Sequence, residues 1–258
     1  MRTDVEDVMA YCQGVKSIDE VLDTLLEPVH HYKSESERRT VYEVWLIIVK
    51  AAEETPFQEQ EPIVCLCETL KQRKVPIDEE SKRDWRLNDD ELDDDSQPPP
   101  FLGAIIREEL DIVSDHSDAY INLCAFSAYL TICSTANLGD YCLHALWMIR
   151  EAFEDHESIA DLVLHQSITK IRAARVWLQI AGSRLNKACL ENEEFFGKMG
   201  TIGKGAQSEL DESIKGFTIG RWQFWHSRIE GLYQTSRLDD EMRQECKLAL
   251  QAMNESGR

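Results

Sequence analysis

The chain has 258 residues, of which 43% are apolar and 29% are charged, and its formal charge is −20 at pH 7. This size and composition indicate a globular protein with a buried core and exclude global disorder. The strong negative charge disfavours binding to nucleic acid and to anionic membrane surfaces, because both present phosphate groups.

Helical periodicity dominates the first part of the chain. It predicts helices over residues 5–14, 17–32, 35–54 and 57–73. Ser17 and Glu20 have the spacing of a capping box at the start of the second helix. Pro28 is expected to kink or shorten that helix, and Pro62 favours a regular start of the fourth, since proline suits a first turn.

Residues 74–100 break this pattern with acidic residues and prolines. Ten acidic and three basic side chains lie between residues 78 and 95. Asp89-Asp90-Glu91-Leu92-Asp93 spells the D-D-x-x-D motif that holds magnesium in helical terpene synthases. However, no apolar stripe anchors it, and the second magnesium motif of those enzymes is missing. We interpret the stretch as a solvated, flexible acidic loop, poorly ordered over about 88–97.

Helical patterns resume in the second part of the chain, over residues 101–113, 118–136, 140–153, 158–181, 186–189, 220–234 and 238–253. The segment 118–136 is apolar nearly all round, which predicts a buried central helix. Gly182 is expected to end the helix predicted over residues 158–181. Residues 197–216 are rich in glycine and are predicted to form a mobile loop or lid. The fold class is therefore all-α, a single-domain bundle of about nine to eleven helices spanning residues 1–258.

The cysteines and the N-terminus favour a cytoplasmic protein. The eight cysteines include no C-x-x-C pair, so we expect reduced, mostly buried thiols and no metal site. No run reaches the eighteen or more apolar residues of a membrane span. The first residues are acidic and lack the basic and apolar regions of a signal peptide.

The segment "GRWQFWHSR", residues 220–228, is the most distinctive candidate for a binding site. On a helix Arg221, Trp225 and Arg228 share one face, and Trp222 and His226 share the next. The aromatic residues could anchor a C-terminal helix while the arginines meet surface acids. The other interpretation is a pocket wall in which Arg221, Trp225 and His226 bind or polarise an apolar ligand with a carboxylate or carbonyl.

Other polar residues lie within apolar helical patterns. Asn122 either ties neighbouring helices together or, with Tyr129, orients a ligand. His144 and His165 are either core residues or, if they line a cavity, the natural proton donors. The candidate catalytic residues are thus His144, His165, His226 and Arg221, and the candidate substrate-binding residues are Asn122, Phe126, Tyr129, Trp147, Arg175, Trp177, Trp222 and Trp225.

Standard catalytic and cofactor signatures are absent from the sequence. It contains no G-x-S-x-G, P-loop, G-x-G-x-x-G or H-E-x-x-H motif. "GTIGKG", residues 200–205, lacks the strand–loop–helix setting that a phosphate cradle requires. We therefore expect no cofactor.

Five segments carry a resemblance to a known family: "VYEVWLIIVKAAEETPFQEQEPIVCLCETLK", "DWRLND", "YINLCAFSAYLT", "AARVWLQIAGSRLN" and "GRWQFWHSR". In this order they resemble a fungal, mainly ascomycete, helical family of unknown function, over roughly residues 35–233. The resemblance implies a fungal intracellular helical protein, and some family members are thought to lie in secondary-metabolite gene clusters. The acidic stretch departs from the family pattern.

Three functional hypotheses follow. The first is a cofactor-independent isomerase, cyclase or pericyclase of natural-product biosynthesis, with a hydrophobic terpenoid or polyketide substrate bound between helices. The second is a non-catalytic helical interaction or regulatory protein. The third and least favoured is a magnesium-dependent terpene cyclase. The sequence leaves the oligomeric state open.

Overall fold

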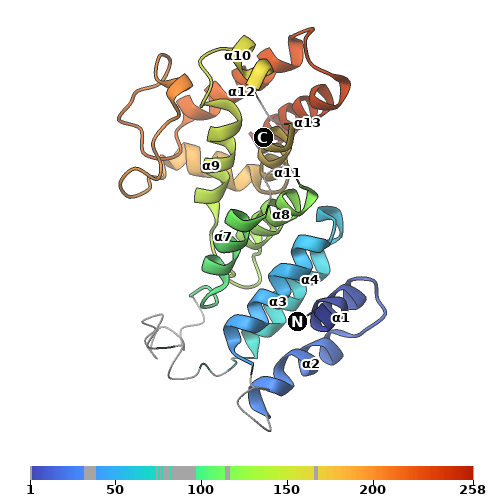
Figure 1. Ribbon diagram of the computed structural model, residues 1–258. Coiled ribbons are helices and arrows are strands. Elements are labelled where there is room, and N and C mark those ends of the chain that lie inside the picture. The colour runs from blue at the N-terminus through green and yellow to red at the C-terminus, as the bar shows by residue number, and fades with distance from the viewer. Residues whose placement is uncertain are drawn as a thin grey trace. The chain divides into compact units, whose positions relative to one another are not determined.

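The computed structural model describes residues 2–31, 39–73, 75, 77, 82, 97–113, 117–165 and 168–257, except for the side chain of His165. Over these residues it contains eleven α-helices and two short 3-10 helices (Figure 1). An isolated antiparallel bridge joins Glu194 and Gly216. The predicted all-α class is confirmed.

The helices group into two compact units. Unit 1 comprises residues 1–114 and 118–140, and unit 2 comprises residues 115–117 and 141–258. The negative charge of the chain is concentrated in the first part: residues 1–140 contain 31 acidic and 13 basic side chains, and residues 141–258 contain 17 and 15. Each unit is described by itself below.

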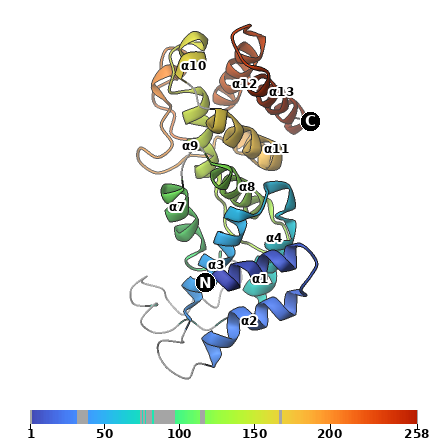
Figure 2. The same cartoon turned by 45° about the vertical axis from the view of Figure 1, so that its right-hand side comes forward.

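Unit 1 is built around one buried helix, α3. The unit contains α1 (Arg2–Cys12), α2 (Ile18–His30), α3 (Val41–Glu54), the 3-10 helix η1 (Phe57–Glu59), α4 (Glu61–Gln72), α7 (Leu102–Ile112) and α8 (Asp118–Ile132). α3 contacts α1, α2, α4, α7 and α8, and α1 lies beside α2 (Figures 1 and 2). Val44, Trp45 and Ile48 of α3 are almost fully buried, and each such side chain contributes about 1.5–3 kcal/mol.

Local capping signals set two helix starts in unit 1. The predicted capping box is confirmed: Ser17 Oγ accepts from Glu20 N at 3.3 Å, and Ser17 N donates to Glu20 Oε2 at 2.8 Å. A second box, Thr40 with Glu43, starts α3 at Val41, later than the predicted start because Thr40 is an extended N-cap. α4 begins with a proline in its first turn, as predicted, and α2 continues through Pro28 to His30.

The central helix predicted over 118–136 is α8, which ends at Ile132. Ten of its fifteen residues are buried, and they lie on every side of the helix. The buried position is confirmed. The reason is compositional, because a helix without a polar face is stable only when other elements surround it.

Unit 2 is built around α11. The unit contains α9 (Cys142–Phe153), α10 (Ile159–His165), α11 (Ile168–Glu191), the 3-10 helix η2 (Lys204–Ala206), α12 (Ile219–Gln234) and α13 (Asp240–Ser256). α11 packs along α13 and also contacts α9 and α12. Trp177 and Leu185 of α11 are fully buried, so this helix is the centre of the second core.

The prediction that Gly182 ends a helix is wrong. α11 continues through Gly182 to Glu191, so the short piece predicted over 186–189 is part of the same helix. A Cβ atom on Gly182 would overlap the Ser256 side chain of α13. The glycine therefore permits a close approach of two helices, a role that its neighbours in the sequence do not reveal.

Candidate functional site

The predicted site residues fall into both units. Asn122, Phe126 and Tyr129 belong to α8 of unit 1, whereas all the other predicted site residues belong to unit 2. Within unit 2, Arg221, Trp222, Trp225 and His226 lie on α12, and Arg175 and Trp177 lie on α11. Each group is therefore examined within its own unit.

The residues on α8 serve the packing of unit 1. Asn122 Nδ2 donates to the carbonyl oxygen of Glu53 at 2.9 Å, and Gln60 Nε2 donates to the carbonyl oxygen of Asn122 at 3.0 Å. Phe126 is fully buried. Burial raises the pKa of Tyr129, and the carboxylate of Glu61 raises it further. The geometry fits the interpretation that Asn122 ties neighbouring helices together.

The strongest polar cluster of unit 2 is centred on Arg221. Its Nε and Nη2 atoms donate to the two carboxylate oxygens of Glu154 at 2.6 and 2.9 Å, and both side chains are 0% exposed. Nη1 donates to the carbonyl oxygens of Gly200 and Gly216, both at 2.8 Å. Nη2 also donates to the carbonyl oxygen of Thr201 at 3.3 Å. All five N–H groups of the guanidinium therefore have protein acceptors.

Glu154 is satisfied as completely as its partner. Its Oε1 atom also accepts from Trp225 Nε1 at 2.6 Å, and its Oε2 atom accepts from the backbone N–H of Gly203 at 2.7 Å. The backbone N–H of Gly205 donates to the carbonyl oxygen of Glu154 at 2.6 Å. A buried ion pair is stable when every remaining donor and acceptor is engaged, and this pair meets that condition.

Aromatic rings surround the ion pair. The Trp225 ring meets Phe217 edge-on with 6.1 Å between centroids, and Trp222 at 6.3 Å. The guanidinium carbon of Arg221 lies 5.6 Å from the Trp225 centroid. Trp225 is fully buried. This arrangement fits the interpretation that the segment 220–228 anchors α12, although the acid that Arg221 meets is buried rather than on the surface.

The segment that we name the glycine loop, residues 193–217, is held by this cluster. A Cβ atom on Gly200 would overlap the backbone of Lys215, and one on Gly205 would overlap the backbone of His156. Arg228 Nη2 donates to the carbonyl oxygen of Gly205 at 3.0 Å. The glycines thus permit close backbone packing within the loop and against the residues that follow α9. The mobile lid predicted over residues 197–216 stays a prediction, although this loop makes the close contacts named above.

Glu154 is the residue of this cluster that the sequence analysis missed. It lies at the C-terminal end of α9, among other acidic residues, 67 positions before Arg221. No local spacing distinguishes it from its exposed neighbours Asp155 and Glu157. Only the fold brings its carboxylate to the arginine.

Arg175 belongs to a second ion-pair network, between α11 and α13. Its Nε atom donates to Glu245 Oε2 at 2.8 Å, and its Nη1 atom donates to Gln179 Oε1 at 2.6 Å. Arg172 Nε donates to the other oxygen of Glu245 at 3.0 Å. Trp177 is fully buried, and its indole N–H has no acceptor among the described residues. The network joins α11 and α13, which pack along each other.

The hydrogen bonds described for the two networks involve neither His144 nor His226. His144 is half-buried, with its ring stacked on Trp147 at 5.6 Å between centroids and beside Tyr141 at 5.7 Å. Trp147 Nε1 donates to the carbonyl oxygen of Met199 in the glycine loop at 2.9 Å. His226 is half-buried on α12. The side chain of His165 lies outside the described part of the structure.

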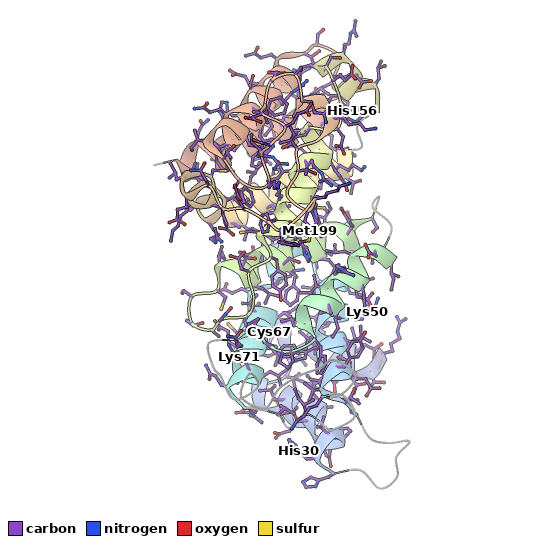
Figure 3. All side chains as sticks on the ribbon, turned by 90° about the vertical axis from the view of Figure 1, so that its left-hand side faces the viewer. His30, Lys50, Cys67, Lys71, His156 and Met199 are labelled. Atoms are coloured by element: carbon purple, nitrogen blue, oxygen red, sulfur yellow. The ribbon has the colours of Figure 1, made fainter. Side chains whose placement is uncertain are left out.

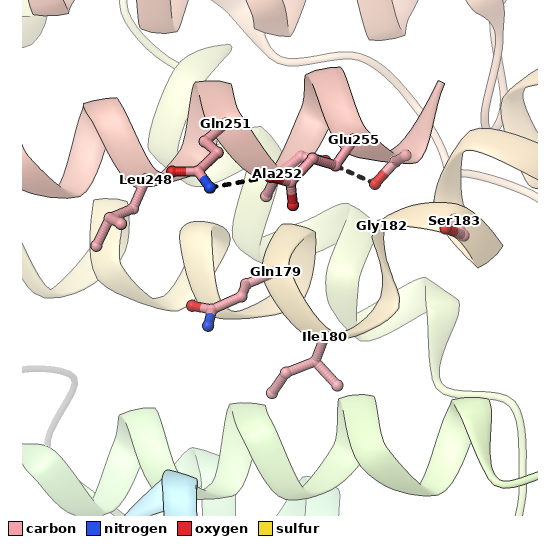
Figure 4. A pocket seen from close by; sticks show the side chains of 9 residues that line it. Gln179, Ile180, Gly182, Ser183, Leu248, Gln251, Ala252 and Glu255 are labelled. Carbon is pink, nitrogen blue, oxygen red and sulfur yellow. Dashed lines mark hydrogen bonds between the residues drawn. The ribbon is translucent and has the colours of Figure 1, made fainter. Parts of the chain in front are cut away.

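Two cavities are described, one in each unit. A groove of about 260 Å³ in unit 2 lies between α11 and α13 (Figure 4) and is lined by Gln179, Ile180, Gly182, Ser183, Leu248, Gln251, Ala252, Glu255 and Ser256. A depression of about 400 Å³ in unit 1 is lined by Asp23, Leu26, Glu27, His30, His31 and Arg73; His30 is labelled in Figure 3. None of the predicted site residues lines either cavity.

The magnesium hypothesis concerns residues that the structure does not describe. The whole D-D-x-x-D motif, Asp89 to Asp93, lies outside the described residues, as do residues 88–96 of the stretch predicted to be poorly ordered. In the described part of the chain no group of three or more His, Cys, Asp or Glu side chains could hold a metal ion. None of the described helices has the length and apolar character that a membrane crossing needs.

Residues 45–229, well over half of the chain, match the model of a family described as a protein of unknown function, DUF3632. The chain belongs to this family. No curated protein and no solved structure matches it. The part of the DUF3632 chain that matches the family model runs from α3 to α12 and contains the entire Glu154–Arg221 cluster, whereas α1, α2 and α13 lie outside it.

Proposed function

We propose that this chain is a non-catalytic helical interaction protein and that the glycine loop is its docking element. The carrying observation is Phe196, whose side chain is 91% exposed within this loop. A large apolar side chain left in water forgoes about 1.5–3 kcal/mol of burial energy, which a partner can recover.

Two further apolar side chains of unit 2 accompany Phe196. Leu190, at the end of α11, is 62% exposed, and Met199, labelled in Figure 3, is 43% exposed. Aromatic residues and methionine are enriched at the centres of protein interfaces. The adjacent carboxylates of Glu191 and Glu194 are exposed. Exposed Lys198 and Lys215 belong to the same loop, so its surface carries both signs. The partner chemistry that fits is a protein with an apolar pocket and a polar rim.

The backbone around Phe196 is held on both sides. Phe195 N donates to the carbonyl oxygen of Lys215 at 2.8 Å, and Phe217 N donates to the carbonyl oxygen of Glu193, also at 2.8 Å. On the other side, Arg221 holds Gly200 and Thr201. A loop held in one conformation loses little entropy on binding, so the buried ion pair supports presentation of Phe196.

The cofactor-free catalytic function predicted from the sequence is the competing proposal, and fungal natural-product biosynthesis is part of it. It requires donors or acceptors that remain available to a substrate. Arg221, its main polarising residue, directs every N–H group to a protein acceptor. This geometry favours the interaction proposal over the catalytic one.

Site-specific photo-cross-linking tests the proposal. A photoreactive phenylalanine analogue is placed at position 196 and, in a matched control, at position 164, where Leu164 of α10 is 73% exposed in the same unit. In cells of the source organism we expect a defined adduct from position 196 and none from position 164. The isolated partner should then bind the unmodified chain and lose binding to Phe196→Ala.

Two results would count against the interaction proposal. One is the same pattern of adducts from positions 196 and 164, which would indicate random collision. The other is a partner that binds Phe196→Ala as tightly as the unmodified chain. Either result would favour the catalytic proposal over the interaction proposal.

A further inference from the structure

The groove between α11 and α13 is lined mostly by polar side chains that are exposed to solvent. At one end Gly182 and Ser256 bring the two helices into close contact. Further along α11, the ion pair between Arg175 and Glu245 joins the same helices. Between these contacts the helices leave about 260 Å³ (Figure 4), room for a ligand of roughly ten heavy atoms.

Three side chains of this groove are oriented by their neighbours and keep hydrogen-bonding capacity. Gln179 Oε1 accepts from the buried Arg175, and the Gln179 NH₂ group has no acceptor among the described residues. Gln251 Nε2 donates to Glu255 Oε1 at 2.9 Å, and within the described part of the chain Gln251 Oε1 and Glu255 Oε2 have no donors. The dashed line between Gln251 and Glu255 in Figure 4 marks this bond. Ser183 adds an exposed hydroxyl.

The electrostatic environment of the groove favours a cation. Glu255 supplies a carboxylate, and no Lys, Arg or His is among the lining residues. Gln251, Ala252, Glu255 and Ser256 form the C-terminal end of α13, where the last carbonyl groups of a helix have no intrahelical donors and the helix dipole is negative. The last turn of α13 contains no basic side chain. A positive group would therefore gain from both the carboxylate and the helix end.

We propose that the α11–α13 groove binds a small hydroxylated primary amine. The ammonium group donates to Glu255 Oε2 and to Gln251 Oε1. The hydroxyl groups accept from the Gln179 NH₂ group and exchange hydrogen bonds with Ser183. The site is separate from the glycine loop, and its α13 wall lies entirely outside the segment that matches the family model. The binding specificity would then belong to this chain rather than to the family segment.

Three sugars that differ at one position test the charge requirement: glucosamine, N-acetylglucosamine and glucose. Titrations of the full chain are carried out below the pKa of the glucosamine amine and are followed by calorimetry and by the side-chain amide NMR signals of Gln179 and Gln251. We expect a dissociation constant of about 1 mM for glucosamine. The two uncharged sugars should bind at least about tenfold more weakly, because they lack the charge-assisted hydrogen bond.

A matched pair of variants tests the location. Glu255→Gln should weaken glucosamine binding about tenfold. Glu230→Gln is the control, since Gln234 and Glu230 form the same kind of exposed Gln–Glu pair on α12, away from the groove. Both variants should keep the helical circular dichroism of the unmodified chain, because both carboxylates are exposed.

The proposal is overturned by any of three results: no binding of glucosamine, equal binding of all three sugars, or equal effects of Glu255→Gln and Glu230→Gln. Photo-cross-linking at position 196 does not depend on this site. The amine site and the docking function can therefore fail independently.

Discussion

Glu154 and Arg221 form a two-point ion pair in which neither side chain is exposed to solvent and every donor of the arginine has a protein acceptor. The pair joins the end of α9 to the start of α12 and holds the glycine loop between them. Its charged residue types also occur in catalytic sites, but here their hydrogen-bonding groups are engaged by protein partners, as in a structural ion pair. Four predictions follow from it and from the surrounding core.

Removal of one partner of the ion pair should strongly destabilise unit 2. Glu154→Gln leaves Arg221 buried without a counter-charge, and we expect a loss of about 3–5 kcal/mol in the free energy of unfolding. Urea unfolding followed by circular dichroism measures this loss. The control is Glu241→Gln, which removes a carboxylate that is 67% exposed and pairs with Arg172; it should cost less than about 1 kcal/mol. Equal losses in the two variants would contradict the structural role.

The glycine loop should reject side chains at its close contacts. A Cβ atom at Gly205 would overlap the His156 carbonyl group, and one at Gly216 would overlap that of Glu193. We expect Gly205→Ala and Gly216→Ala to lower the melting temperature by several degrees, since each costs roughly 1–3 kcal/mol of overpacking. Gly220→Ala is the control, because its Cβ would meet its nearest neighbour at 3.9 Å. A normal melting temperature in the first two variants would show that the loop is more adaptable than described.

Substitutions of the adjacent Phe195 and Phe196 should differ in their effect on the free energy of unfolding. Phe195 packs against Phe217 at 5.9 Å between ring centroids, whereas Phe196 is 91% exposed. Phe195→Ala should therefore lower the free energy of unfolding by about 1–3 kcal/mol. Phe196→Ala should change it by less than about 0.5 kcal/mol. Chemical denaturation measures both. A large loss from Phe196→Ala would mean that the side chain is packed, and the docking proposal would lose its main support.

Buried thiols should make the fold sensitive to alkaline pH. Burial raises the pKa of Cys246 and that of Cys189 to about 12, well above the ordinary range of a thiol. The folded state favours the neutral thiols, so their contribution to stability is complete below about pH 9 and is lost as the pH rises through 12.

The check is the difference in the free energy of unfolding between the unmodified chain and Cys246→Ala. This difference should be constant below about pH 9 and should shift in favour of the variant above it, because the variant has no thiol to ionise on unfolding. Urea unfolding at about pH 8 and about pH 11 measures it. A difference that does not change with pH would mean that the thiol titrates normally.

Local signals explain which parts of the fold could be predicted. The capping box of Ser17 and Glu20 needs only two residues three positions apart, and both are on the same turn. The burial of α8 follows from its composition alone. Gly182 shows the limit of such signals: a glycine after an apolar helix commonly ends it, but here it lies inside the helix, where Ser256, 74 positions later, approaches it closely.

The functional candidates divide in the same way. The segment 220–228 is distinctive in sequence because aromatic and arginine side chains recur at helical spacing, and the structure places Arg221 and Trp225 together as predicted. What those residues do depends on Glu154, Gly200 and Gly216. Of these three, only Gly216 is near them in the sequence. The sequence does not show whether the N–H groups of an arginine side chain are free or hydrogen-bonded to other parts of the protein.

The sequence by itself determined the all-helical class, most of the helix positions, the buried α8 and two members of the polar cluster, Arg221 and Trp225. These follow from periodicity and capping, which act over a few neighbouring residues. Only the tertiary structure decided that Glu154 is the partner of Arg221, that the glycine loop contacts this pair and leaves Phe196 exposed, and that α11 and α13 leave a polar groove. These depend on contacts between residues tens of positions apart, whose geometry is set by the packing of whole helices.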